Sequence, residues 1–556
     1  MQQKFLEKTL GQQIADMAAK YPDDNMIDYT DRDYSRTWKE FNDECETIAR
    51  GFMALGLKKG SHISIWGTNV PAWLLTFFGS AKMGGILVTV NTSYKVFELD
   101  YQLKQSDSEA IVLIDGYKGT SYIDIINELC PELESCEPGK LKSHRLPLLK
   151  SVIYAGEGEC PAGMVDWKDL YTLAEQTPVE EFEAVRDSCD CHEVVNIQYT
   201  SGTTGFPKGV MLTHYNILNN GQTIGDGMKF THEDRLCITV PFFHCFGMVL
   251  ALMSCISHGT PFVPIDMFNA KKVMDALATK HCTAVHGVPT MFIAMLEHPD
   301  FDKYDFSHMR TGIMAGSPCP IKTMYDVSEK MNMRDIVIVF GQTEAAPGCT
   351  MTTTEDSLET RCATVGKAFP GVECKIVDPN TGETLPAGEI GEFCARGYNI
   401  MKGYYKMPEA TAQAIDKDGW LHFGDLAVCD ENGYYKVTGR LKDMIIRGGE
   451  NIYPKELEEC LYHNDRVKDV QVIGVPSKKY GEEVCACVIL KEGEDMTEEE
   501  IKAYYKENVA FFKIPKYVWI MDEFPMTASG KIQKFVLRDM AVEKYSLQSD
   551  DSIETA

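Results

Sequence analysis

Residues 199–214 read YTSGTTGFPKGVMLTH and place short hydroxyl side chains, glycines and one lysine between two strand-like runs. Glycine lets the backbone turn its N–H groups toward an anion, and a lysine adds a fixed positive charge. The residues expected to form this phosphate cradle are Thr200, Ser201, Gly202, Thr203, Thr204, Gly205 and Lys208. The pattern therefore predicts a nucleotide triphosphate as the ligand of an α/β protein.

The spacing within this loop argues against the commonest phosphate-binding motif. A Walker loop has the pattern G-x-x-x-x-G-K-[ST] between a strand and a helix. Here Pro207 precedes Lys208 and Gly209 follows it, and the alternation in GVMLTH favours a returning strand. A P-loop NTPase is therefore disfavoured, and a glycine- and threonine-rich hairpin without a ligand is the remaining alternative.

Length and composition indicate a large soluble enzyme with more than one domain. The chain has 556 residues, of which 44% are hydrophobic and 25% are charged. Its formal net charge of −27 disfavours nucleic acid and anionic membranes as partners. The apolar residues 70–90 contain Lys82 and a Gly-Gly pair, so they predict a buried helix and a strand rather than a membrane span. The 19 cysteines, together with an N-terminus unlike a signal or transit peptide, predict a cytoplasmic location.

Four segments of the chain resemble the adenylate-forming superfamily, which includes AMP-binding acyl-CoA synthetases, firefly luciferases and the adenylation domains of peptide synthetases. They are residues 199–214, 339–347 (VFGQTEAAP), 419–458 and 525–534 (PMTASGKIQK). The resemblance implies a large N-terminal domain of layered α/β sheets with a β-barrel-like part, over residues 1–441. It also implies a small, mobile α+β C-terminal domain over residues 442–545, with Lys442 as the hinge. We expect the acidic tail, residues 546–556, to be disordered.

The segment VFGQTEAAP follows an apolar run that predicts a strand over residues 335–340. Open α/β sheets bind ligands at the carboxyl ends of their strands, so Gln342, Thr343 and Glu344 are expected beside the nucleotide. By the resemblance, Thr343 contacts phosphate, and Glu344 helps to hold Mg²⁺ together with Thr203. The structural alternative is that Glu344 serves only as a favourable acid at the start of a helix.

Asp425 and Arg440 lie in a predicted hairpin whose turn is residues 430–433. By the resemblance, Asp425 accepts hydrogen bonds from the ribose hydroxyls and Arg440 lies near ribose and phosphate. A structural salt bridge is the alternative for both residues. The resemblance also implies that coenzyme A is a cosubstrate and that the following loop contacts it through Arg447, Gly448 and Gly449.

Lys531 follows a Ser-Gly turn, so its ammonium group is expected to project from a loop tip. By the resemblance it is the adenylation lysine, which neutralises charge as the carboxylate approaches the α-phosphate of ATP. Lys531 and Glu344 are therefore the predicted catalytic residues. Their separation in sequence requires closure of the two domains.

Residues 241–247, PFFHCFG, match an aromatic-rich family motif and make His244 a candidate for the wall of the acyl pocket. The stretch GIMAGSPCP places Ala315, Gly316 and Ser317 where relatives have their acyl and adenine pockets. The segments that look most like the fatty acyl-CoA ligases of the medium-chain acyl-CoA synthetase family member 2 type are residues 340–344 (FGQTE), 447–454 (RGGENIYP), 512–517 (FKIPKY) and 529–535 (SGKIQKF). The resemblance thus implies an ATP- and Mg²⁺-dependent, AMP-forming acyl-CoA synthetase for medium- or long-chain fatty acids.

Two alternatives and the assembly state stay open at this point. An aryl-acid–CoA ligase of the 4-coumarate or benzoate type would share every motif and differ only in the pocket. A stand-alone adenylating enzyme that serves a carrier protein is the second alternative. A homodimer is neither favoured nor excluded by the sequence.

Overall fold

The computed structural model describes residues 4–200, 207–316, 319–447, 450–477, 480–509, 511–527 and 531–547. Contacts divide the chain into a large and a small compact unit: the large one is Met1–Cys374 with Ala395–Leu421, and the small one is Lys375–Cys394 with His422–Ala556. This confirms a large N-terminal and a small C-terminal part. Lys442 lies within the small unit, in the 3₁₀ turn η6 (Leu441–Asp443). Because a hinge describes a movement, its position at Lys442 stays a prediction.

The first sheet of the large unit has seven strands in the order β16-β15-β14-β12-β13-β1-β2. All neighbouring pairs are parallel except β1 with β2. The strands are β1 (Asn25–Asp28), β2 (Ser35–Thr37), β12 (Leu236–Ile238), β13 (Phe262–Pro264), β14 (Ala284–Gly287), β15 (Thr311–Met314) and β16 (Asp335–Val337).

The second sheet also has seven strands, in the order β11-β10-β4-β3-β5-β8-β9. Only β10 and β11 are antiparallel. The strands are β3 (His62–Trp66), β4 (Ile86–Thr89), β5 (Ala110–Leu113), β8 (Ser151–Tyr154), β9 (Val165–Asp166), β10 (Val194–Thr200) and β11 (Lys208–Thr213). A separate two-stranded ribbon joins β6 (Gly116–Tyr117) to β7 (Thr120–Ser121).

The apolar residues 70–90 fold as predicted, into α3 (Pro71–Lys82), a glycine break and strand β4. Every residue of α3 after Pro71 is buried, which explains why the segment is apolar on all sides. Gly84 has φ +71°, a left-handed conformation that glycine adopts without strain. Among the described residues, none of the helices combines the length and the apolar character needed to span a bilayer.

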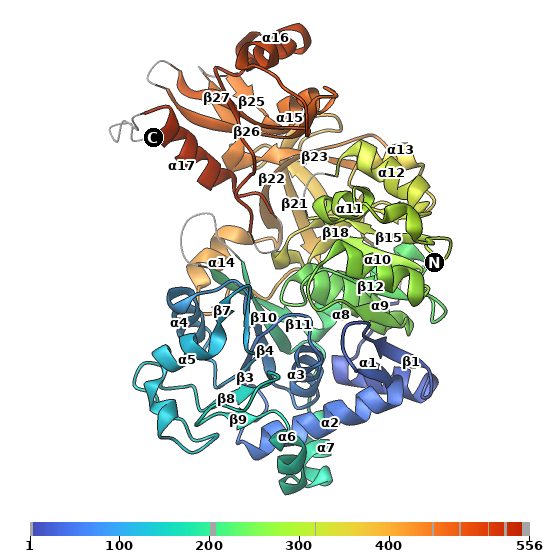
Figure 1. Ribbon diagram of the computed structural model, residues 1–556, viewed down its shortest axis with the longest axis vertical. Helices are drawn as coiled ribbons and strands as arrows, with labels where there is room; N and C mark the ends of the chain where they lie inside the picture. The colour runs from blue at the N-terminus through green and yellow to red at the C-terminus, as the bar shows by residue number, and fades with distance from the viewer. Residues whose placement is uncertain are drawn as a thin grey trace. The chain divides into compact units, whose positions relative to one another are not determined.

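Helices cover the sheets of the large unit (Figure 1). They are α1 (Leu10–Lys20), α2 (Trp38–Ala54), α3, α4 (Val96–Gln105), α5 (Tyr122–Leu129), α6 (Asp169–Leu173), α7 (Val179–Asp187), α8 (His214–Met228), α9 (Ser254–His258), α10 (Ala270–Thr279), α11 (Pro289–Leu296), α12 (Ile321–Lys330), α13 (Leu358–Ala363) and α14 (Pro408–Ala414). A run of π-helix, η3 (Phe246–Met253), precedes α9.

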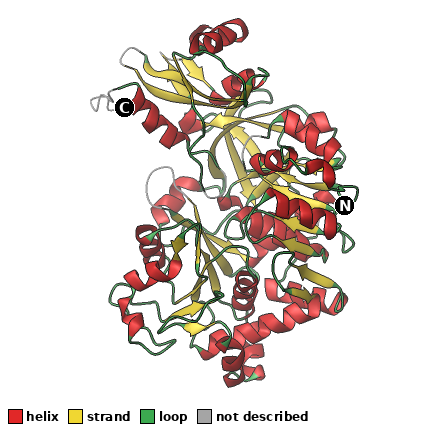
Figure 2. Cartoon of the chain, in the orientation of Figure 1, coloured by secondary structure: helices red, strands yellow, loops and turns green. Residues whose placement is uncertain are grey.

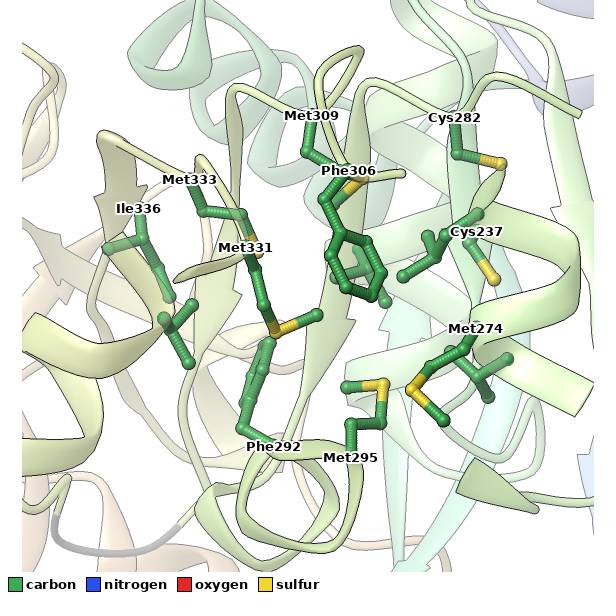
Figure 3. Packing of buried hydrophobic residues seen from close by; sticks show 14 of the residues in the cluster. Cys237, Met274, Cys282, Phe292, Met295, Phe306, Met309, Met331, Met333 and Ile336 are labelled. Atoms are coloured by element: carbon green, nitrogen blue, oxygen red, sulfur yellow. The ribbon is translucent and has the colours of Figure 1, made fainter. Parts of the chain in front are cut away.

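A methionine-rich core fills the space between α10, α11, α12 and the first sheet (Figure 3). Phe292 and Met295 of α11 are buried in it, together with Met331 and Met333. The flexible thioether side chains of methionine fill irregular gaps between helices and a sheet. Phe292 therefore contributes to the core of the large unit.

Two smaller open sheets occur where the barrel-like part was expected. One contains β17 (Val339–Gly341), β18 (Gly348–Met351) and β19 (Lys367–Ala368), and the other contains β20 (Val372–Val377), β21 (Ile390–Gly397), β22 (Leu421–Cys429) and β23 (Tyr435–Arg440). Within the described ranges neither sheet closes on itself, because each order begins and ends on a different strand. The predicted barrel-like part is therefore a pair of open sheets and not a closed barrel, and the prediction was wrong on this point.

The small unit also contains a sheet in the order β25-β24-β27-β26, with β28 paired to β27. Its strands are β24 (Ile445–Arg447), β25 (Glu450–Ile452), β26 (Val467–Ser477), β27 (Gly481–Leu490) and β28 (Tyr517–Ile520). Helices α15 (Pro454–Tyr462), α16 (Glu498–Asn508) and α17 (Lys534–Lys544) accompany the sheet (Figure 2). Helix α15 begins with Pro454, whose fixed φ suits the first helical turn.

Candidate active site

Strands β10 and β11, on either side of the cradle segment, pair antiparallel, and Thr200 lies opposite Lys208. The predicted return of the chain as a strand after Lys208 is thus confirmed. Residues 402–405 run beside β11: the N–H of Met211 donates to the carbonyl of Gly403, and the N–H of Tyr405 donates to that of Gly209. The predicted phosphate ligands that lie outside the described residues are Ser201, Gly202, Thr203, Thr204 and Gly205.

Tyr404 joins the hairpin to the second predicted motif. The Nζ atom of Lys208 lies 4.9 Å from the centre of the Tyr404 ring. The hydroxyl of Tyr404 donates a hydrogen bond to Oε1 of Glu344 at 2.8 Å. Burial and the Glu344 carboxylate raise the pKa of Tyr404, so its hydroxyl remains a donor. The sequence did not predict a role for Tyr404, because the local stretch MKGYY does not indicate contacts with Lys208 and Glu344, which are distant in sequence.

The predicted strand over residues 335–340 is in fact two strands in two sheets. Ile338 exchanges hydrogen bonds with Thr352, whose Oγ1 accepts from the N–H of Ile338 at 2.9 Å and whose own N–H donates back to the Ile338 carbonyl at 3.0 Å. These bonds separate β16 from β17, which pairs with β18 instead of the first sheet.

Thr343 and Glu344 lie in the 3₁₀ turn η5 (Thr343–Ala345), which directly follows Gln342. Both side chains are buried. The carbonyl of Glu344 accepts from the N–H of Met401 at 2.9 Å, which ties the turn to the same segment that carries Tyr404. Glu344 is thus held at both its backbone and its carboxylate.

His244 lies two residues before the π-helix η3, and its Nδ1 accepts from the N–H of Phe246 at 3.2 Å. The next residue, Cys245, brings this motif to the turn η5, since its Sγ lies 3.6 Å from Oγ1 of Thr343. π-Helical turns are rare and occur frequently at functional sites. The structure thus places the predicted acyl motif beside a predicted phosphate ligand.

Ala315 and Gly316 follow β15 at its carboxyl end. Ala315 is buried, and its N–H donates to the carbonyl of Gly287 at the end of the neighbouring strand β14. Gly316 has φ +90°, a conformation that residues with a side chain rarely adopt. Both residues therefore lie where open α/β sheets bind ligands, whereas Ser317 lies outside the described residues.

Asp425 and Arg440 face each other on β22 and β23 of the small unit, as the predicted hairpin requires. Nε of Arg440 donates to Oδ1 of the buried Asp425 at 3.1 Å. Burial raises the pKa of Asp425 above its ordinary value, and the positive charges of Arg440 and Lys531 act in the opposite direction. Lys531 and Asp425 are therefore within electrostatic reach of each other.

Glu392 of β21 and His422 restrain strand β22 just before Asp425, and sequence reasoning missed both. Oε1 of Glu392 accepts from the N–H of Gly424 at 3.0 Å, and its Oε2 lies 2.8 Å from Nδ1 of His422. A carboxylate that bonds a backbone N–H and a neighbouring ring at once restrains the chain strongly. Their only sequence signal is a pair of polar residues in otherwise apolar strands.

Lys531 is held in a closed loop before α17. Its N–H donates to Oγ1 of Thr527 at 3.1 Å, and its carbonyl accepts from the N–H of Thr527 at 2.7 Å. Lys531 thus lies outside helices and strands, whereas the projection of its ammonium group and its catalytic role stay predictions. At Lys442, the predicted hinge, burial lowers the pKa of the ammonium group.

The guanidinium of Arg447, predicted to approach coenzyme A, is bound within the small unit. Its Nε donates to Oε2 of the buried Glu483 at 2.6 Å, and another nitrogen donates to the carbonyl of Phe512 at 3.1 Å. Gly448 and Gly449 lie outside the described residues. A contact with coenzyme A therefore stays a prediction.

Comparison with known proteins places this geometry in a family. The model of the AMP-binding enzyme family matches residues 14–405, and that of the AMP-binding enzyme C-terminal domain matches residues 456–531. The chain belongs to the AMP-binding enzyme family. The resemblance of the chain to the adenylate-forming superfamily is thereby confirmed.

Individual relatives place this AMP-binding enzyme among the acyl-CoA synthetases, which are ligases. It is 51% identical over 546 residues to the "Putative acyl-CoA synthetase YngI" of Bacillus subtilis (strain 168), covering 98% of this chain and 99% of the relative. It is 39% identical over 545 residues to the mitochondrial medium-chain acyl-CoA ligase ACSF2 of Bos taurus, covering 97% of this chain and 88% of the relative. The crystal structure of ATP-bound MatB from Rhodopseudomonas palustris matches with a TM-score of 0.83 at 28% identity, covering 97% of this chain and all of the other.

Proposed function

We propose that this enzyme is an AMP-forming acyl-CoA synthetase that activates medium- or long-chain fatty acids with ATP. The observation that carries the proposal is the convergence of Lys208 and Glu344 on Tyr404 in the large unit. A cation from the cradle hairpin and a buried carboxylate are what a metal–triphosphate complex needs. The names of ATP-bound MatB and the medium-chain ligase ACSF2 support ATP and a medium-chain acid as the substrates.

In the first half-reaction, a carboxylate oxygen of the acid attacks the α-phosphorus of ATP. The bond between that phosphorus and the bridging oxygen breaks, which leaves an acyl-adenylate and pyrophosphate. Lys531 would stabilise the charge that accumulates as the two anions meet. Thr343, Gln342 and the cradle would hold the phosphates, while Asp425 and Arg440 would hold the ribose.

Glu344 and Thr203 would hold Mg²⁺. Both side chains offer oxygen ligands, which suit this hard cation, and the Glu344 carboxylate is already oriented by Tyr404. When bound, Mg²⁺ neutralises charge on the phosphate oxygens.

In the second half-reaction, the coenzyme A thiol releases its proton to solvent and its sulfur attacks the acyl carbon. The bond between acyl carbon and AMP breaks, which yields the thioester and AMP. Rotation of the C-terminal domain about Lys442 would replace Lys531 by the loop of Arg447 between the two steps.

The test is pyrophosphate release by the purified protein with octanoate, palmitate, 4-coumarate and benzoate, each with and without coenzyme A. We expect release with the two fatty acids and a thioester product when coenzyme A is present. Preference for an aryl acid would replace the substrate assignment but keep the ligase. Pyrophosphate release without any thioester would remove the ligase assignment and favour an enzyme that serves a carrier protein.

A further inference from the structure

Tyr404 contacts both charged groups of the proposed metal–triphosphate site. Its ring lies under the Lys208 ammonium at 4.9 Å, and its hydroxyl bonds to Oε1 of Glu344 at 2.8 Å. Lys208 begins strand β11, whereas Glu344 lies in the turn η5 between β17 and β18, far away in sequence. Tyr404 itself is buried.

The backbone around Tyr404 is fixed on three sides. Residues 402–405 bond to β11, which begins with Lys208, and the N–H of Met401 donates to the carbonyl of Glu344. The N–H of Tyr404 donates to Oγ1 of Thr411 at 2.9 Å. The ring is therefore presented by a rigid segment, which is what a positioning residue requires.

We propose that Tyr404 is a positioning residue whose hydroxyl orients Glu344 toward Mg²⁺ and whose ring holds Lys208 until the triphosphate binds. The inference rests on the proposed function, because it assigns Glu344 to the metal. Fixing Oε1 also sets the direction in which Glu344 presents its second oxygen. A cation–π contact is weaker than a charge-assisted bond to phosphate, so the triphosphate displaces the ring from the ammonium.

The first test measures metal binding without turnover. Tyr404→Phe keeps the ring and loses the hydroxyl, and Mn²⁺ serves as a spin probe in the presence of α,β-methylene-ATP, which cannot transfer its adenylyl group to an acid. Loss of a hydrogen bond that orients a metal ligand typically weakens metal binding 10- to 100-fold, so we expect about 10-fold weaker Mn²⁺ binding. The Mg²⁺ concentration for half-maximal pyrophosphate release should rise by a similar factor.

Tyr405→Phe is the matched control. The hydroxyl of Tyr405 donates to Oδ2 of Asp107 at 2.9 Å, so this variant removes the same kind of phenol–carboxylate bond one residue away. We expect its Mn²⁺ binding and Mg²⁺ requirement to equal those of the wild-type enzyme.

A second pair of variants separates the ring from the hydroxyl. Tyr404→Leu removes both, so it should raise the KM for ATP above that of Tyr404→Phe, because Lys208 is then no longer held in place. Equal KM values would overturn the role of the ring. In a Glu344→Gln background, Tyr404→Phe should cause no further loss of Mn²⁺ binding, and an additional loss would show that the hydroxyl acts elsewhere.

Unchanged Mn²⁺ binding in a folded Tyr404→Phe protein, with normal thioester synthesis by the wild type, overturns the inference and leaves the function intact. A wild-type protein that releases no pyrophosphate with any acid overturns the function instead. If Tyr404→Phe does not fold, Tyr404→His retains an N–H donor and should keep metal binding closer to wild type than Tyr404→Leu does. The reverse order would also overturn the inference.

Discussion

Lys531 carries the charge most directly linked to the proposed chemistry. Its loop is closed by two hydrogen bonds to Thr527, and its charge reaches Asp425. Lys531→Ala should slow acyl-adenylate formation by about 10²- to 10³-fold, the usual cost of removing one group that stabilises transition-state charge. ATP binding and thioester formation from supplied acyl-adenylate should change little, which single-turnover assays of each half-reaction can measure.

The control for this variant is Lys502→Ala, which removes a lysine paired with Glu498 on α16 of the same unit. Both half-reactions should proceed normally in the control. An equal loss of the two half-reactions in Lys531→Ala would contradict the role in adenylation.

Asp425 is a buried acid whose ionised form is costly to the fold. The pKa of Asp425 is higher in the folded protein than in the unfolded chain. The free energy of unfolding therefore falls as the pH rises from the unfolded-state pKa to the folded-state pKa. At neutral pH the cost is about 1.4 kcal/mol for each unit of the rise. Asp425→Asn should therefore raise the melting temperature at pH 7 while weakening ATP binding, and the gain should vanish below about pH 4.

Thermal unfolding of both proteins between pH 4 and pH 8 measures this effect. After the substitution, Arg440 stays solvated because its side chain is half exposed. A stability gain that grows as the pH falls would show that the charge of Asp425 is not its cause.

At the scale of elements, the turn of Glu344 depends on a tight hairpin between β17 and β18. A Cβ atom added to Gly341 would lie 1.8 Å from the carbonyl oxygen of Pro347, so the strands would have to separate. Gly341→Ala should cost about 1–3 kcal/mol of stability, the usual cost of overpacking, and should lower activity by displacing Glu344. Urea unfolding and pyrophosphate release measure the two effects.

Gly67→Ala is the matched control, because its added Cβ would meet Ile114 at 3.4 Å, an ordinary contact distance. It should leave both stability and activity close to wild type. A Gly341→Ala protein as stable and active as this control would mean that the hairpin can open without cost.

Local patterns predicted the elements whose causes are local. The helix, glycine break and strand over residues 70–90 follow from an apolar run and the conformational freedom of glycine. The split at Ile338 depends on Thr352, which an apolar run cannot reveal. The role of Tyr404 could not be predicted for the same reason, since its hydrogen-bond partner Glu344 is 60 residues away in sequence. The roles of the site residues came from the family resemblance, which assigns residues in motifs but not the side chains that orient them.

At the scale of the whole molecule, a formal net charge of −27 coexists with anionic substrates. In the small unit, the positive charges of Arg440 and Lys531 both act on the buried Asp425, and we proposed above that these residues also meet the nucleotide. A cluster of positive groups raises the local concentration of an anion even when the distant surface repels it. Binding of ATP should therefore depend on these few residues more than on the total charge.

Two buried histidines make the large unit sensitive to acid. Burial lowers the pKa of His286 to about 4 and that of His214 to about 3. Both pKa values lie below the unfolded value of about 6.5, so the two rings are neutral in the fold. Their contribution to stability is complete above about pH 6.5 and is lost as the pH falls toward the folded values. For His286 the loss is on the order of 3 kcal/mol, at about 1.4 kcal/mol per unit.

His286→Asn, which keeps an acceptor for the N–H of Ile313, should remove part of this sensitivity. Urea midpoints at pH 7 and pH 4.5 measure it: the wild-type midpoint should fall more steeply than that of the variant. His463→Asn, at an exposed histidine in the small unit, is the control and should follow the wild type. Parallel curves for wild type and His286→Asn would mean that the acid sensitivity of the large unit arises from other groups, with His214 as the next to be replaced.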